Sequence, residues 1–176
     1  MQLEPFLRPF YQDLDGVSRA GEVARVARIA RMLHTPDSPA DARAFELLLH
    51  FHLLGTWLEK VGNLSRALLA IDGVTEAELR ATAASIRRLD APQSAAERAV
   101  AAAVLIDGGG VRGLAERLAR ARREGSSIDD VAKRGAFRSE LPSWLPLQAV
   151  AWLEARQQER ARVCQRILDE EALHDL

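Results

Sequence analysis

Two of the four histidines, His50 and His52, lie one residue apart in the apolar stretch LLLHFHLLGTWLEKVG at 47–62. Imidazole nitrogens bind divalent metals and transfer protons near neutral pH, so both side chains are candidates for chemistry. In a regular helix they point about 200° apart, because each residue turns the chain by about 100°. The two histidines therefore cannot share one metal, and at most one faces a given site. The alternative interpretation is that both are hydrogen-bonded histidines in or beside the core.

A second candidate is the stretch DGGGVRG at 107–113, where consecutive glycines could expose backbone N–H groups to an anion at the start of the next helix. No P-loop lysine follows it, and no strand is expected before it. The simpler interpretation is a flexible break between two helices. The stretch RLARARREG at 117–125 is rich in arginine, but Glu116 and Glu124 flank it. We interpret it as a solvated helix face.

The single cysteine, Cys164, has little support as a nucleophile, since no histidine lies near it in the sequence. It cannot form an internal disulfide, which favours a reducing compartment. The stretch MQLEPFLRPFYQDLD has acids and prolines where a signal peptide has an apolar core. The longest apolar run is far short of the roughly 20 residues that span a bilayer. We therefore expect a cytoplasmic protein without a membrane partner.

The overall composition supports a globular chain. Of the 176 residues, 48% are hydrophobic and 28% are charged, and the net charge is −1. Disordered chains have fewer apolar residues and a larger net charge. Nucleic-acid binding usually requires a basic excess, so we do not expect a nucleic-acid partner.

The elements that position these residues are expected to be helices. Ala, Leu, Arg and Glu dominate the sequence, and alternating β-branched segments are absent. The stretches SPAD, TEAE, SAAE and SIDD, which begin at 38, 75, 94 and 127, carry helix-start signals. The predicted helices are 17–33, 39–61, 64–71, 75–89, 94–106, 111–124, 127–134 and 146–173.

These helices are expected to form an all-α fold, a single compact bundle over 1–176 with 1–16 as an N-terminal cap. Only short breaks separate the helices, so no linker divides the chain. Almost every position from 47 to 58 is apolar, which predicts that the helix at 39–61 is buried nearly all round. The long amphipathic helix at 146–173 is compatible with a homodimer.

The order of these segments, from about residue 15 to the end, resembles the HD superfamily of metal-dependent phosphohydrolases. The stretches that carry the resemblance are EVARVARIARML, HLLG, AAVLIDGGGVRGLAERLARA and WLEARQQERARVCQRILDEE. In that family an early helix carries a His three residues before an RV pair, and a buried helix carries a His-Asp pair. A later helix ends in an Asp. Together these side chains hold a divalent metal, so the resemblance implies an HD-like helical fold.

Carried over residue by residue, the family motif is incomplete. The first His position falls on Glu22, and the second aligns with His52 in HLLG. The Asp that should follow this His is Leu53, whereas the last ligand position carries Asp107. The shifted register that uses His50 also lacks the Asp, and we prefer His52 because the glycine of HLLG then fits.

Two classes of function remain open from the sequence. In the first, the chain is a divergent metal-dependent phosphohydrolase that acts on a nucleotide or another phosphate ester. The resemblance then implies that Glu22, His52 and Asp107 hold Mn, Zn or Mg, and that Arg112 neutralises the phosphate. In the second, which we favour, the metal site is degraded. The domain then survives as a non-catalytic binding or interaction domain, with a small phosphate-containing molecule as a possible ligand. The two classes differ in whether the three ligands converge or Leu53 and its neighbours fill the space.

Overall fold

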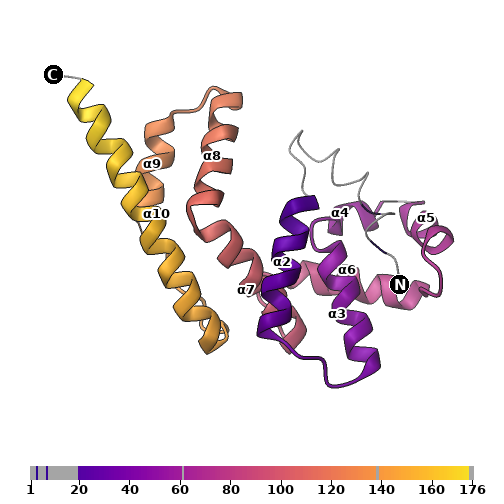
Figure 1. The fold of residues 1–176 in the computed structure, drawn as a ribbon. Coiled ribbons are helices and arrows are strands. Elements are labelled where there is room, and N and C mark those ends of the chain that lie inside the picture. The colour runs from indigo at the N-terminus through magenta and orange to yellow at the C-terminus, as the bar shows by residue number, and fades with distance from the viewer. Residues whose placement is uncertain (1–2, 4–6, 8–19, 61, 138, 175–176) are drawn as a thin grey trace. The chain divides into compact units, whose positions relative to one another are not determined.

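The computed structural model describes residues 3, 7, 20–60, 62–137 and 139–174. Every regular element in these ranges is a helix, with no strand among them (Figure 1), so the all-α prediction is confirmed. The helices are α2 (Ala20–Leu33), α3 (Pro39–Phe51), α4 (Gly55–Leu58), α5 (Asn63–Ala70), α6 (Glu76–Arg87), α7 (Ala95–Gly109), α8 (Val111–Glu124), α9 (Ile128–Ala136) and α10 (Leu147–His174). The predicted cap at 1–16 lies outside the described residues, apart from Leu3 and Leu7, which are buried.

The helix-start signals in the sequence act as predicted. In each case an N-cap hydroxyl accepts the backbone N–H three residues later, at 3.1–3.3 Å; the caps are Ser38, Thr75, Ser94 and Ser127. At two of these starts the reciprocal bond is also present. The Glu78 carboxylate accepts the Thr75 N–H at 2.7 Å, and the Glu97 carboxylate accepts the Ser94 N–H at 3.2 Å. Local side-chain chemistry therefore determines where these helices begin.

The prediction of one continuous helix over 39–61 is wrong. Helix α3 ends at Phe51, and the Leu54 N–H donates to the Phe51 carbonyl at 2.7 Å to form a turn. The short helix α4 then begins at Gly55 and packs against α5 and α6. Phe51 and Leu54 are both buried in one apolar cluster. The break lets apolar side chains of α3 and of α4 reach the same cluster. In one unbroken helix these residues would point to different sides, and some of them could not reach it.

The other helix ends agree with the predicted bounds to within about one turn. The predicted start of the first helix, at 17–19, lies outside the described residues. Among the other ends the largest difference is at α7, which continues to Gly109 instead of ending at 106. The backbone becomes extended only at Gly110, the N-cap of α8, with φ −95° and ψ −166°. Only the third of the three consecutive glycines therefore forms the predicted break.

The chain divides into two compact units, residues 1–103 and residues 104–176. The division falls within α7, where no break in the sequence marks it. Each unit has its own apolar cluster. The expectation of one domain over 1–176 stays a prediction. No helix within the described ranges is long and apolar enough to cross a membrane.

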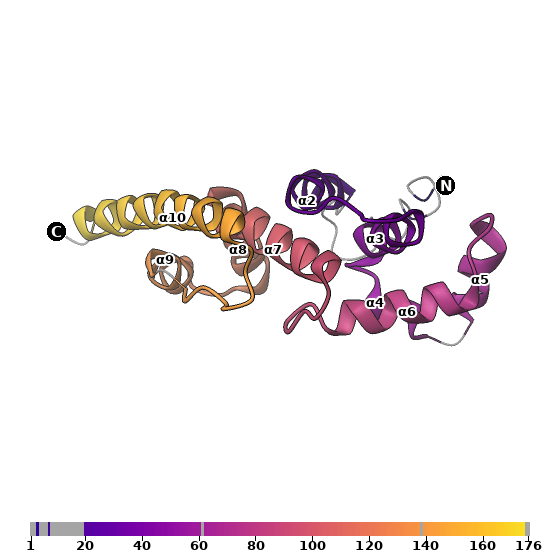
Figure 2. The same cartoon turned by 90° about the horizontal axis from the view of Figure 1, so that it is seen from below.

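The first unit is built around α3. Helix α2 packs on α3, and α3 in turn contacts α6 (Figure 2). The buried apolar side chains include residues of α3, α4, α5 and α6, namely Leu47, Phe51, Leu58, Ala67 and Leu79. This cluster surrounds the end of α3, where the candidate histidines lie.

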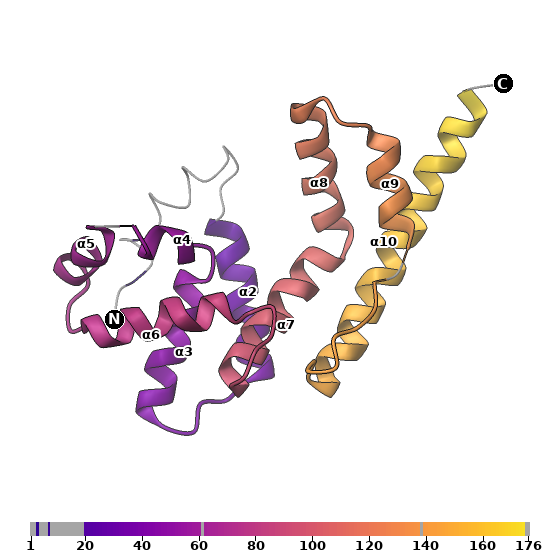
Figure 3. The same ribbon diagram turned by 180° about the vertical axis from the view of Figure 1, so that it is seen from behind.

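The second unit contains α8, α9 and α10. Helix α9 packs against both α8 and α10 (Figure 3). The buried cluster between these helices contains Leu114, Ala121, Val131 and Cys164. It is small, and a large share of the side chains along these three helices is polar or charged. Because this core is small, polar side chains of α8, α9 and α10 lie close to it.

Candidate functional site

His52 is a buried histidine at the end of α3. Its side chain and backbone together are only 7% exposed, and it forms the C-cap of the helix. The ring atom Nδ1 lies 2.7 Å from the carbonyl oxygen of Leu49. Because a carbonyl only accepts, this short distance places the ring proton on Nδ1. His52 thus satisfies an otherwise orphaned carbonyl in the last turn of α3, which is a structural role.

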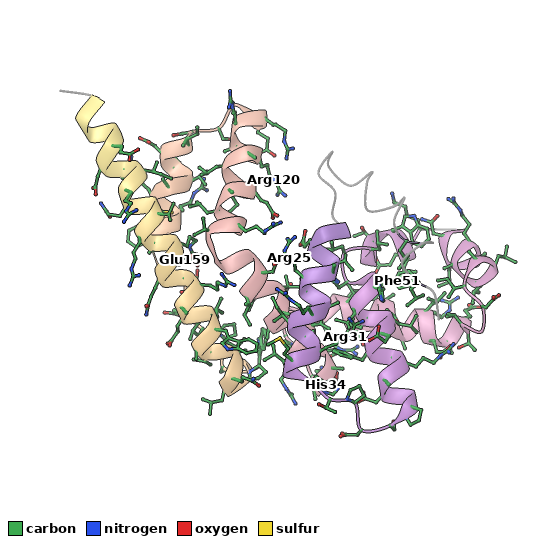
Figure 4. The ribbon with its side chains drawn as sticks, viewed as in Figure 1. Arg25, Arg31, His34, Phe51, Arg120 and Glu159 are labelled. Carbon is green, nitrogen blue, oxygen red and sulfur yellow. The ribbon has the colours of Figure 1, made fainter. Side chains whose placement is uncertain are left out.

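His50 lies on a different face of α3. Its Nε2 atom is 3.6 Å from Glu46 Oε2, one turn earlier on the helix. Glu46 also accepts two hydrogen bonds from Arg31 of α2, at 3.0 and 2.8 Å. These bonds outweigh partial burial and raise the pKa of Arg31. His50 therefore belongs to a polar group that joins α2 to α3, and His52 is the histidine that faces inward. Figure 4 shows Arg31 on α2.

The other residues predicted for the metal site lie on separate helices. Glu22 is half-buried in the first turn of α2, in the same unit as His52. Asp107 is half-buried near the end of α7, and Arg112 is exposed in the first turn of α8; both belong to the second unit. Among the residues that the structure describes, no three His, Cys, Asp or Glu side chains come together closely enough to hold a metal ion. The ligand assignment of Glu22, His52 and Asp107 stays a prediction from the sequence.

Leu53 is the residue that the resemblance aligns with the aspartate of the HD motif. It is partly buried and packs against the apolar cluster of the first unit. A leucine supplies no metal ligand, whereas structural and catalytic metal sites need several donors in fixed geometry. The residues at this position therefore do not fit a resident metal held in the family's manner.

Gly55 has a packing role that explains its place in HLLG. A Cβ atom added at this position would lie 2.7 Å from Cγ2 of Ile86, on α6. Ile86 is β-branched, so this methyl group cannot easily turn away. The glycine therefore lets α4 approach α6 closely.

We expect Gly55→Ala to destabilise the first unit by about 1–3 kcal/mol, the usual cost of overpacking a well-packed contact. Urea-induced unfolding followed by circular dichroism measures this change. In the background of Ile86→Ala, which removes the obstructing methyl group, the same substitution should cost much less. An alanine at 55 that leaves the midpoint unchanged in the wild-type background would contradict the close-packing explanation.

The second unit holds a cavity that the sequence analysis missed. Its volume is about 410 Å³, and arginines from three helices line it: Arg117 and Arg120 from α8, Arg134 from α9, and Arg160 from α10. Figure 4 labels Arg120 on α8. The two α8 residues belong to the arginine-rich stretch that we interpreted as a solvated face. That interpretation is incomplete, because part of this face lines a cavity.

A signal for this cavity was present in the sequence. Arg117 and Arg120 are three residues apart, so they share a helix face, and they lie beside the buried Ala121. Arg160 could not be joined to them from spacing alone, because it lies on α10, about 40 residues later in the chain. Its recruitment depends on the packing of α10 against α8 and α9.

Comparison with known proteins adds no relative: no family model, curated protein or solved structure matches this chain.

Proposed function

We propose that this chain is a divergent HD-like domain in which apolar packing has replaced the metal site, and that it works as a non-catalytic binding domain. The observation that carries this proposal is the packing of Leu53 into the apolar cluster beside His52. Leu53 occupies the position of the metal-binding aspartate in the motif that the sequence resembles.

The state of His52 supports the same proposal. A catalytic metal lowers the pKa of bound water only when several ligands hold it in an open site. His52 is buried, and its Nδ1–H donates to the Leu49 carbonyl, a hydrogen bond that metal-binding histidines also make. The support therefore comes from the side chains around the ring. In the described part of the chain, no cluster of three donor side chains surrounds it. A non-catalytic binding function needs neither an open metal site nor a cluster of metal ligands.

The test is the metal content of the full chain, purified without an affinity tag and measured by plasma mass spectrometry. We expect no stoichiometric divalent metal, even after incubation with Mn, Zn or Mg followed by desalting. The variants His52→Ala and Asp107→Ala serve as matched comparisons and should give the same background as the wild type.

About one divalent ion per chain, lost in both variants, would overturn the proposal. That result would favour the phosphohydrolase alternative and would justify a screen of nucleotides and other phosphate esters. Metal that is retained in both variants would indicate binding elsewhere and would leave the proposal intact.

A further inference from the structure

The arginine-lined cavity of the second unit is strongly biased toward positive charge. Among its lining residues, four arginines are accompanied by one acid, Glu124. The hydroxyl groups of Ser126 and Ser139 also line it and can donate hydrogen bonds. Arginine guanidinium groups bind phosphate through two parallel N–H···O bonds, so this set of donors matches a phosphate group better than any neutral ligand.

Three of these arginines have no carboxylate partner among the described residues, because their hydrogen bonds go to backbone carbonyls. Arg117 donates to Gly108 at 3.2 Å, and Arg134 donates to Asp130 at 3.0 Å. Arg160, which is only 7% exposed, donates to Gly135 at 3.0 Å and to Phe137 at 2.8 Å. These carbonyls hold the guanidinium groups in place without neutralising their charge. Arg117 and Arg134 are exposed, whereas the charge of Arg160 is buried, and a buried charge without a counterion is costly. An anion that enters the cavity beside Arg160 would therefore be stabilised.

The positive charges also act on one another. Loss of hydration and the nearby charge of Arg160 lower the pKa of Arg117, although Glu116 partly offsets this effect. Burial raises the pKa of the Cys164 thiol, while Arg160 and Arg117 oppose that rise. Burial is the larger cause of both shifts, and the charges of Arg160 and Arg117 add a smaller effect that a bound dianion would offset.

A second cavity of about 300 Å³ adjoins the first and shares Arg117, Ser139 and Arg160 with it. Its remaining lining is largely apolar and includes Val104, Leu105, Pro142 and Leu153. Glu140 also lines it and would repel a second anionic group. The ligand that fits both cavities therefore has one anionic end and an uncharged, apolar body.

We propose that the second unit binds a small phosphate monoester, with the phosphate among Arg117, Arg134 and Arg160 and an apolar body in the adjoining cavity. This inference rests on the proposed function, a non-catalytic binding domain, because it names the class of ligand that such a domain binds. The two fail separately, because phosphate binding here requires no metal.

The experiment is isothermal titration calorimetry of the full chain at fixed salt with EDTA present throughout. Phenyl phosphate is the probe, inorganic phosphate tests the contribution of the apolar body, and phenol tests the contribution of the phosphate. The variants Arg117→Gln and Arg134→Gln each remove one cavity charge. Arg123→Gln removes the same charge from an exposed position of α8 outside the cavity, so it is the matched control.

We expect phenyl phosphate to bind the wild type and Arg123→Gln with the same Kd, and to bind both cavity variants at least about tenfold more weakly. Inorganic phosphate should bind more weakly than phenyl phosphate, and phenol should give no binding heat. Thermal unfolding checks that each variant is folded. If Arg117→Gln unfolds, Arg134→Gln decides the question, because its hydrogen bond lies within its own helix.

Equal Kd values in all four proteins, or no binding of phenyl phosphate, would overturn the inference. Equal affinity for phenyl phosphate and inorganic phosphate would overturn the assignment of an apolar body. Binding of phenol as tight as that of phenyl phosphate would show that the phosphate, and with it the arginines, contributes nothing to binding. Release of phenol from phenyl phosphate would instead contradict the non-catalytic function.

Discussion

Gly113→Ala is expected to destabilise the second unit by about 3 kcal/mol or more, the upper range for overpacking. Gly113 is buried in the first turn of α8. A Cβ atom at this position would overlap the carbonyl oxygen of Gly108 and would lie 2.6 Å from its carbonyl carbon. The obstructing atoms are backbone, so no side-chain rotation can relieve the contact. Helix α8 must move relative to the end of α7, or the cluster around Leu114 must open.

The matched control is Gly108→Ala, on the other side of the same contact. A Cβ atom at 108 meets no atom within 4 Å, and Gly108 is helical. Alanine there should stabilise the helix by up to about 1 kcal/mol. Urea-induced unfolding, followed by circular dichroism, compares the two variants with the wild type. Equal urea midpoints for Gly113→Ala and the wild type would contradict the close contact between Gly113 and the Gly108 carbonyl group.

Glu97→Gln is expected to destabilise the first unit by about 3 kcal/mol at neutral pH. The Glu97 side chain is 2% exposed, and its carboxylate accepts hydrogen bonds from Arg88 at 2.5 Å and from the N–H groups of Gln93 and Ser94. Burial opposes ionisation of this carboxyl, but these donors outweigh burial and lower its pKa to about 2. The neutral amide loses the charge and leaves Arg88 without its anion.

The pH dependence of this difference follows from the lowered pKa of Glu97. The unfolded chain protonates this carboxyl near the ordinary glutamate pKa of 4.5, and the folded chain does so only near 2. The stabilisation is therefore complete above about pH 4.5 and is lost as the pH falls toward 2. The gap between the unfolding free energies of wild type and variant should shrink over the same range.

The control for Glu97 is Glu59→Gln. Glu59 forms an exposed ion pair with Arg87, so its removal should change the free energy of unfolding by less than about 1 kcal/mol. The measurement is urea-induced unfolding of the three proteins at a series of pH values. A Glu97→Gln variant that is as stable as the Glu59→Gln variant at pH 7 would contradict the assigned ion pair.

Much of the fold follows from local signals that could be seen in the sequence. Ser94 and Glu97 are three residues apart, and a capping box forms wherever that pair meets the start of a helix. No distant part of the chain has to be known. The same holds for the αL glycine that ends α8, Gly125, with φ 67°.

The break between α3 and α4 was not predictable in this way. His52, Leu53 and Leu54 are all compatible with a continuing helix. Just after the break, Gly55 packs closely against Ile86, which lies about 30 residues further along the chain, so local spacing does not show this contact. The break also places His52 at the end of α3, where its ring hydrogen-bonds to the Leu49 carbonyl.

The sequence by itself determined that the chain is helical and where most helices begin. These features depend on residue type and on neighbours within one helical turn. Only the tertiary structure decided which histidine is buried, where the long apolar segment breaks, and which arginines share a cavity. Arg160 joins Arg117 only because α10 packs beside α8 and α9. Contacts between residues far apart in the chain depend on how whole helix faces fit together, and no local spacing encodes that fit.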